Sequence, residues 1–218
     1  LVAMAINANN GDWVMWNVGR VLWSRPLLKW IVGAPLDLDV HPDAQALADR
    51  QQGVVLVANH TSLLDINAAF AASPTPIVFL SKASARKGTL LVKLNGVAVT
   101  VFGERGYRPS AEKAVQQLTE TLWQLLSVLV FPEGTRSKDG QLQPFKKGDF
   151  HLAKAAGAPI VPMHISGTWD RLSPDAWLIG PSTAPVRVSI GAPLSEQDET
   201  PGDTMARAEH AVAALGQR

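Results

Sequence analysis

The sequence predicts an α/β domain with a mostly parallel sheet flanked by helices, and three observations carry that prediction. Short apolar runs of strand length alternate along the chain with longer segments of helical period. Two of the runs, Gly53–Ala58 and Ser127–Phe131, are apolar after their first residue, which is typical of parallel strands buried on both faces. At 218 residues, 46% of them hydrophobic, the chain is long enough for one substantial core and short for two. We therefore expect one domain over residues 36–218, preceded by a helical segment over residues 1–35.

That N-terminal segment is rich in tryptophan. It holds four of the seven tryptophans, Trp13, Trp16, Trp23 and Trp30. On a helix these four fall within about 100° of one another and would form one stripe. Indole rings concentrate where hydrocarbon meets water, so one interpretation is an interfacial helix that attaches the chain to a membrane. The alternative is a helix that docks on the domain core. Pro26 is expected to kink or break the helix near Leu22.

The strands are expected from short apolar or alternating runs bounded by turn residues. Leu36–Val40 alternates apolar and acidic residues, as a half-buried strand does. Gly53–Ala58 is opened by a glycine and closed by Asn59 and His60. The other runs that we expect as strands are Pro76–Lys82, Val97–Phe102, Ser127–Phe131, Pro159–Ile165 and Val186–Ile190.

The helices are expected between these strands, where apolar residues recur with a helical period. Pro109–Gln124 shows that period clearly, and Pro109 or Ser110 marks its start. Thr61 and Ser62 are natural N-caps for the helix that follows Gly53–Ala58. The remaining helices that we expect are Pro42–Arg50, Arg86–Leu94, Gly148–Ala156 and Met205–Leu215.

The composition excludes several kinds of function. The chain has no cysteine, which removes disulfides, thiolate metal ligands and a cysteine nucleophile. The net charge is +1 and the basic residues are dispersed, so no surface for nucleic acid is indicated. The glycine-rich nucleotide motifs and the Gly-x-Ser-x-Gly elbow of serine hydrolases do not occur. No metal site is expected, because the histidines other than His60 lack a paired spacing with carboxylates.

The sequence also bears on membrane insertion. No apolar run reaches the roughly 18 residues that a spanning helix needs. No signal peptide is evident, and because the sequence begins with Leu1, a further segment could precede it.

His60 and Asp65 carry the first indication of chemistry. A strand that ends at Ala58 and a helix that starts after Ser62 would place His60 at the carboxyl end of a strand, where open α/β sheets bind ligands. A histidine that takes a proton from a hydroxyl needs one ring nitrogen free and the other bonded to a fixed acceptor. Asp65 could be that acceptor. The alternative is that Asp65 is a favourable charge near a helix N-terminus and His60 a loop residue.

Four segments, taken in order, resemble the sequence blocks of the glycerolipid acyltransferases, the family of 1-acylglycerol-3-phosphate acyltransferase. They are Asn59–Asp65 with its His-x-x-x-x-Asp motif, Val101–Arg105, Phe131–Ser137 and Ile160–Met163. The first and third are very close matches, and the resemblance covers roughly residues 50–165. The second departs from the family pattern, which usually has Phe-Ile-Asp-Arg where this chain has Phe-Gly-Glu-Arg at 102–105. The family's membrane-associating N-terminal helices correspond loosely to residues 13–30.

The resemblance implies a role for each matching residue. His60 would be the general base and Asp65 its orienting partner. The site for the phosphate of the acceptor would be formed by Arg105, Glu133, Gly134, Thr135 and Arg136. Arginine suits a phosphate because its guanidinium is always charged and offers forked donors. Lys146 and Lys147, ahead of a helix, resemble a further family feature that would favour an anion, and the alternative is two exposed lysines on a loop.

The resemblance also implies the reaction. The expected enzyme is an O-acyltransferase that moves a fatty acyl group from acyl-CoA or acyl carrier protein, as co-substrate and without a cofactor, to a lysophospholipid. We expect 1-acylglycerol 3-phosphate as the acceptor, giving phosphatidic acid, while the departure in the second block leaves glycerol 3-phosphate and other lysolipids open. Two other classes stay open, a hydrolase in which the His60–Asp65 pair activates water and a non-catalytic lipid-binding module. The expected location is a membrane surface, as a peripheral or monotopic protein on the cytoplasmic face.

Overall fold

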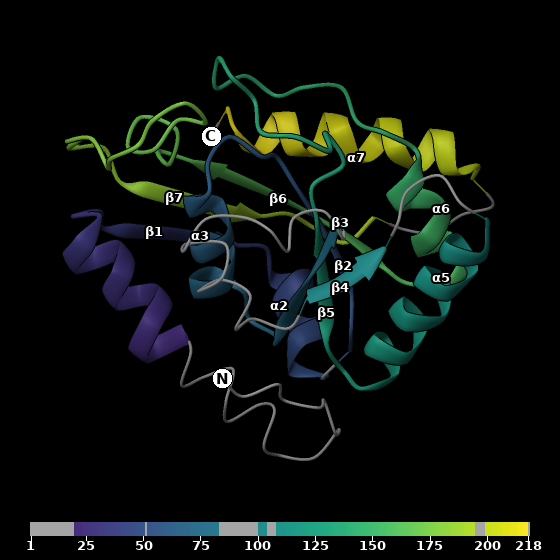
Figure 1. Ribbon diagram of the computed structural model, residues 1–218. Helices are drawn as coiled ribbons and strands as arrows, with labels where there is room; N and C mark the ends of the chain where they lie inside the picture. Colours follow the sequence, from purple (N-terminus) through teal and green to yellow (C-terminus); the bar gives the residue numbers. More distant parts are fainter. Residues whose placement is uncertain (1–19, 51, 83–99, 104–107, 195–198, 218) are drawn as a thin grey trace.

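The computed structural model describes residues 20–50, 52–82, 100–103, 108–194 and 199–217. The strands in these ranges form one seven-stranded sheet in the order β1-β7-β6-β2-β5-β3-β4. Their bounds are Leu36–Val40 (β1), Val55–Ala58 (β2), Ile77–Lys82 (β3), Thr100–Gly103 (β4), Ser127–Val130 (β5), Ile160–Ser166 (β6) and Val186–Ile190 (β7). Neighbouring strands pair in parallel except β6 and β7, which are antiparallel. The predicted α/β fold with a mostly parallel sheet is confirmed (Figure 1).

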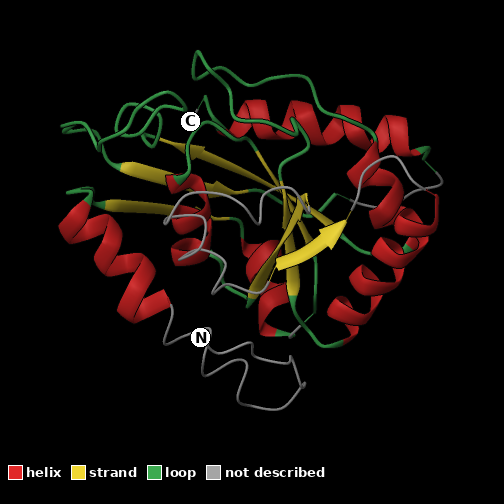
Figure 2. Cartoon of the chain, in the orientation of Figure 1, coloured by secondary structure: helices red, strands yellow, loops and turns green. Residues whose placement is uncertain are grey.

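Helices cover both faces of the sheet (Figure 2). They are Pro42–Asp49 (α2), Leu64–Ala72 (α3), Arg108–Trp123 (α5), Gly148–Ala155 (α6) and Pro201–Leu215 (α7), with two short π-helical segments, Arg20–Ser24 (η1) and Leu27–Ile31 (η2), before β1. The side chains of β2 pack into two hydrophobic clusters, one on each face of the sheet. Leu56 and Ala58 pack into the cluster that contains α3 and η2, whereas Val55 and Val57 pack into the cluster that contains α5, α6 and α7. Alternate residues of a strand point to opposite faces, so a central strand must be apolar throughout.

The described part of the N-terminal segment is built into the domain. Leu27 and Leu28 are buried in the core cluster of α3, and the guanidinium groups of Arg20 and Arg25 each donate at 3.4 Å, to the carbonyl oxygens of Ser73 and Ala71 respectively. Residues 20–34 therefore dock on the core, as the second interpretation of this segment proposes. Trp13 and Trp16 lie outside the described residues, as do the side chains of Trp23 and Trp30, so the stripe stays a prediction.

Of the kink or break that Pro26 was expected to cause near Leu22, the break does not occur. The backbone stays helical from Arg20 to Ile31, and Pro26 itself has α-helical dihedral angles, φ −63° and ψ −38°. The segments on either side are wound as π-helix. Proline breaks an α-helix by clashing with the preceding turn, and a wider π turn leaves more room for its ring.

The other boundaries agree with the prediction to within a few residues, with one difference at α7. This helix begins at Pro201, one turn before the expected Met205, because Thr200 and Asp203 form a capping box ahead of the first apolar residue. The helix expected over Arg86–Leu94 lies outside the described residues, and of the strand expected over Val97–Phe102 only the part from Thr100 is described. Among the described helices, none combines the length and the apolar character required to cross a membrane.

Candidate functional site

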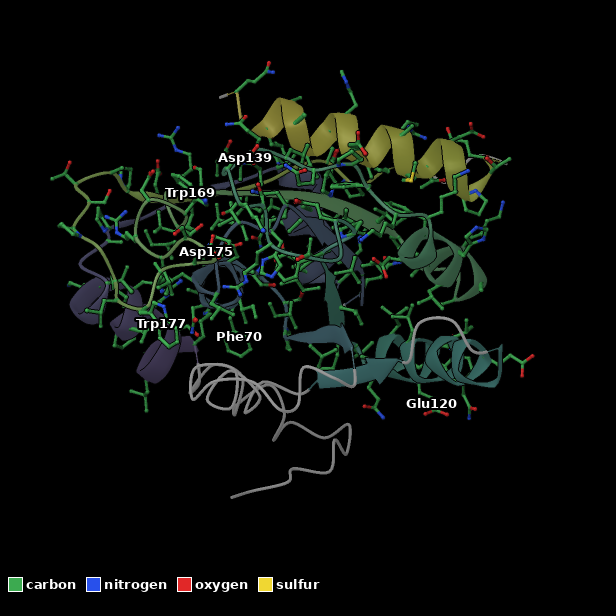
Figure 3. The ribbon with its side chains drawn as sticks, turned by 45° about the horizontal axis from the view of Figure 1, so that its top comes forward. Phe70, Glu120, Asp139, Trp169, Asp175 and Trp177 are labelled. Carbon is green, nitrogen blue, oxygen red and sulfur yellow. The ribbon has the colours of Figure 1, made fainter. Side chains whose placement is uncertain are left out.

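The candidate site lies where three neighbouring parallel strands end. β2 stands between β6 and β5, so the segments that follow these strands meet at one edge of the sheet. Asn59 ties two of the ends together, since its side chain donates to the carbonyl oxygen of Ile165 and accepts from the amide of the same residue, both at 2.8 Å. The Trp169 ring lies over the Gly140 turn, where an added Cβ would be 3.1 Å from it. The loop after β6 and the loop after β5 thus lie side by side, and Figure 3 shows Trp169 and Asp139 on them.

His60 and Asp65 form the predicted pair. The Nδ1 atom of His60 lies 2.9 Å from Oδ2 of Asp65. The Asp65 side chain is 0% exposed, whereas that of His60 is 15% exposed. A carboxylate accepts, so the hydrogen-bond network assigns the imidazole proton to Nδ1 and leaves Nε2 with its lone pair free. This arrangement can remove a proton from a hydroxyl placed at Nε2.

The Asp65 carboxylate is held by more than the histidine. Its Oδ2 atom also accepts from the backbone amides of Thr61 at 2.6 Å and Ser62 at 2.7 Å. Its Oδ1 atom accepts from the hydroxyl of Thr168 at 2.5 Å. Asp65 lies in the first turn of α3, so its charge is also close to the positive end of the helix dipole. The sequence-based role of Ser62 as a cap holds only in part, because its hydroxyl accepts from the Leu64 amide at 3.2 Å and donates to the Leu172 carbonyl oxygen at 2.6 Å.

His60 is also fixed from the side of β5. Its ring stacks on Phe131, with ring centroids 4.0 Å apart and an interplanar angle of 17°. Its backbone amide donates to Oε1 of Glu133 at 2.7 Å, and its carbonyl oxygen accepts from the amide of Ser137 at 2.8 Å. The histidine therefore has little freedom to leave the position that Asp65 gives it.

The Glu133 side chain holds the backbone at His60 in place. It is only 2% exposed, and its second oxygen, Oε2, accepts from the amide of Gln143 at 3.2 Å. Burial raises the pKa of its carboxyl group to about 7, against the two backbone hydrogen bonds, which lower it, and with a smaller contribution from the charges of Asp65 and Asp139. The carboxyl group thus faces the main chain of its own protein, whereas the resemblance had grouped Glu133 with the acceptor site.

The rest of the predicted phosphate site is only partly brought together. Gly134 has φ +74°, which lets the chain turn sharply after β5. Thr135 is exposed and Arg136 half-buried beyond it. Lys146 donates from Nζ to the Glu133 carbonyl oxygen at 2.7 Å, so its charge lies at this turn. Lys147 instead has Nζ near the first turn of α7, 3.7 Å from where a Cβ would stand on Gly202. Arg105 lies outside the described residues.

Among the described residues, no group of three or more histidine, aspartate or glutamate side chains is arranged to hold a metal ion.

Comparison with known proteins assigns the fold and the family. A family model described as Acyltransferase matches residues 39–166, more than half of the chain. The chain belongs to the acyltransferase family. A 1-acyl-sn-glycerol-3-phosphate acyltransferase of Limnanthes douglasii is 30% identical over 175 residues, which cover 80% of this chain and 59% of that protein. The alpha form of the mouse enzyme of that name is 34% identical over 163 residues, 72% of this chain and 55% of that protein. The chain thus spans little more than half the length of these relatives.

A solved structure has the same fold as this acyltransferase-family chain. The crystal structure of the 1-acyl-sn-glycerophosphate acyltransferase from Thermotoga maritima superposes with a TM-score of 0.72 and covers 99% of this chain and 85% of that one. Because only 23% of the residues are identical, this likeness carries the fold alone.

Sequence reasoning missed two contributors to the site. Phe131 belongs to the third sequence block, which predicts no role for it, yet the His60 ring stacks on its side chain. Thr168 lies two residues beyond the range that matches the acyltransferase model, and it was not singled out. A signal for Thr168 does exist in Ser166-Gly167-Thr168, where a hydroxyl residue follows a glycine at the carboxyl end of a buried strand.

Proposed function

We propose that this chain transfers a fatty acyl group from acyl-CoA or acyl carrier protein to the free hydroxyl of a lysophospholipid, with 1-acylglycerol 3-phosphate as the acceptor. The single observation that carries the proposal is the His60–Asp65 pair, in which a fully buried carboxylate orients an imidazole whose second nitrogen has no hydrogen-bond partner among the described residues. The names of the curated relatives support the choice of acceptor.

The reaction that this geometry supports is direct transfer. His60 Nε2 removes the proton of the acceptor hydroxyl as its oxygen attacks the thioester carbonyl carbon. The new carbon–oxygen bond forms, the carbon–sulfur bond breaks, and the imidazolium returns the proton to the leaving thiolate. Asp65 stabilises the imidazolium meanwhile and keeps the proton on Nδ1. The absence of cysteine from the whole sequence favours this route over a thioester with the enzyme.

The acceptor's phosphate would bind at the turn after β5. Gly134 lets backbone N–H groups approach an anion there, and Lys146 adds a positive charge to the turn. Arg136 forms no salt bridge with any described residue, so its forked donors suit the phosphate of a ligand. Arg105 and Lys147 complete the proposed set, with Lys147 at its periphery.

The same proposal places the protein at a membrane surface, as a peripheral or monotopic protein on the cytoplasmic face. A lysophospholipid resides in or on a bilayer, and the described N-terminal helix leaves Val21 and Leu22 exposed. The tryptophan stripe of residues 13–30 would supply the rest of the attachment.

The test is thioester consumption by the purified protein with one labelled acyl-CoA, with and without a panel of lysolipids and glycerol 3-phosphate, scored by product mass. We expect consumption that depends on the acceptor and yields phosphatidic acid. Acceptor-independent release of fatty acid would indicate a hydrolase in its place. Lipid binding without any turnover would indicate a binding module.

A further inference from the structure

The fourth contact of the Asp65 carboxylate comes from outside the segment that the sequence motif covers. Three donors converge on Oδ2, namely His60 Nδ1 and the amides of Thr61 and Ser62, and all belong to residues 60–62. The other oxygen, Oδ1, accepts from Thr168, which is 103 residues away in the sequence. The torsion that sets the plane of a carboxylate is broad. Contacts at one oxygen leave that plane loosely defined, and a contact at the second oxygen fixes it.

The direction of this hydrogen bond is set by its partners. The carboxylate can only accept, so the Thr168 hydroxyl donates at 2.5 Å. The oxygen of Thr168 can in turn accept from the Thr61 hydroxyl, 3.3 Å away. Thr168 is 0% exposed, so water does not compete for this proton.

Thr168 is itself held in place by the loop that it begins. Gly167, with φ +77°, turns the chain after β6, and a Cβ there would lie 2.2 Å from the Pro185 carbonyl oxygen. The Thr168 carbonyl oxygen accepts from the amides of Arg171 and Leu172 at 3.2 and 3.0 Å. Arg171 is buried, and its guanidinium donates to the carbonyl oxygens of Gly167 at 3.0 Å, Ser182 at 2.8 Å and Ala184 at 2.5 Å. The backbone around Thr168 is therefore held by hydrogen bonds, and these fix the position of its hydroxyl beside Asp65.

From these contacts we propose that Thr168 is a positioning residue of the His60–Asp65 pair. Its hydroxyl fixes the plane of the Asp65 carboxylate, and through it the orientation of the His60 ring toward the acceptor hydroxyl. Because Thr168 is fully buried, it is not accessible to either substrate, so its loss should affect the chemical step and leave both binding sites intact. The proposal rests on the proposed function, because it requires that His60 act as the base.

The test compares kcat and KM of four variants with the wild-type protein. Thr168→Val removes the hydroxyl and keeps the shape, and we expect kcat to fall about 10- to 100-fold, as for other residues that orient a functional ligand, with KM of both substrates within about 2-fold. Thr168→Ser restores the donor and should stay within about 3-fold of wild-type kcat. The matched control is Thr75→Val, since Thr75 is also a buried threonine, with its hydroxyl 2.8 Å from that of Ser127 at the opposite edge of the sheet. It should lose comparable stability and keep its kcat.

The fourth variant, His60→Ala, separates this proposal from the function that it rests on. An inactive His60→Ala beside a fully active Thr168→Val would overturn the positioning role and leave the proposed function standing. Normal turnover by His60→Ala would overturn both. Equal losses of kcat in Thr168→Val and Thr75→Val would assign the effect to stability and refute the proposal. If Thr168→Val does not fold, Thr168→Ala, which needs no extra space, is held to the same expected loss of kcat.

Discussion

Replacing Glu133 by Gln tests over which pH range the buried carboxyl group at the end of β5 ionises. The pKa of this group is raised from 4.5 to about 7, mainly because burial disfavours the carboxylate. Between these two pH values the folded protein binds a proton that the unfolded chain has released. The stabilisation that this proton provides is complete below pH 4.5 and is lost as the pH rises through 7. A shift of this size corresponds to up to about 3 kcal/mol in the free energy of unfolding.

The assay is urea unfolding of the wild-type protein and of Glu133→Gln between pH 5 and pH 8. An amide does not titrate here, so the variant lacks this contribution, while all other groups titrate in both proteins and cancel in the difference. We expect the stability of the variant relative to wild type to rise by about 2 to 3 kcal/mol over this range. Glu112→Gln, at an exposed position of α5, controls for the loss of one charge. Stability curves of wild type and Glu133→Gln that stay parallel over the whole range would refute the argument.

Three further predictions concern the site and its attachment. His60→Ala should lower kcat by roughly 10²- to 10⁴-fold, and Asp65→Asn should also lower kcat strongly because its amide can favour the wrong tautomer of His60. The double variant should be about as slow as His60→Ala alone, and additive losses would show that the two residues do not act as one unit. Arg136→Lys keeps the charge but loses the fork, so steady-state kinetics should show a larger rise in KM for the phosphorylated acceptor than for acyl-CoA; equal rises would remove Arg136 from the phosphate site. Deleting residues 1–19, which removes Trp13 and Trp16, should weaken co-sedimentation with vesicles while the domain stays folded by circular dichroism, because Leu28 and its neighbours remain in the core. Undiminished vesicle binding by that truncated protein would exclude Trp13 and Trp16 from the anchor.

The parts of the site that sequence reasoning predicted are local, and those that it did not are set by strand order. The distance between His60 and Asp65 follows from a separation of five positions at one strand-to-helix corner, so the spacing, taken together with the family resemblance, could predict the pair. The contact of Asp65 with Thr168 exists because β6 lies beside β2, and no local pattern states which strands are neighbours. The position of the Glu133 carboxyl group is likewise set by strand order. Its motif was recognised, but the direction of its carboxyl group depends on the packing of β5 against β2.

The same distinction applies to the fold. Apolar runs and helical periods gave most strands and helices to within a few residues, because those signals depend on the chain's own sequence. The antiparallel pairing of β6 with β7 was not predicted. It follows from the connection between them, residues 167–185, which contains no helix that could carry the chain back across the sheet for a parallel pair. Pro26 shows the opposite case, since the break that a local rule predicts is avoided in a helix that is wound as π-helix on either side of the proline and docks on α3.

Two buried carboxyl groups hold His60 from different ends, and one of them, Glu133, changes its ionisation near neutral pH. Asp65 binds the ring, and Glu133 binds the backbone amide of the same residue. When Glu133 is ionised, both its oxygens accept backbone N–H groups; when it is protonated, one oxygen carries a proton and its bond to an N–H group weakens. Because its pKa is about 7, lowering the pH stabilises the fold while it loosens one anchor of His60. Glu133→Gln has a single acceptor oxygen at every pH. It should therefore resemble the protonated wild-type protein, with a kcat that changes less between pH 6 and pH 8 than that of wild type; an unchanged profile would show that the backbone anchor does not govern the position of His60.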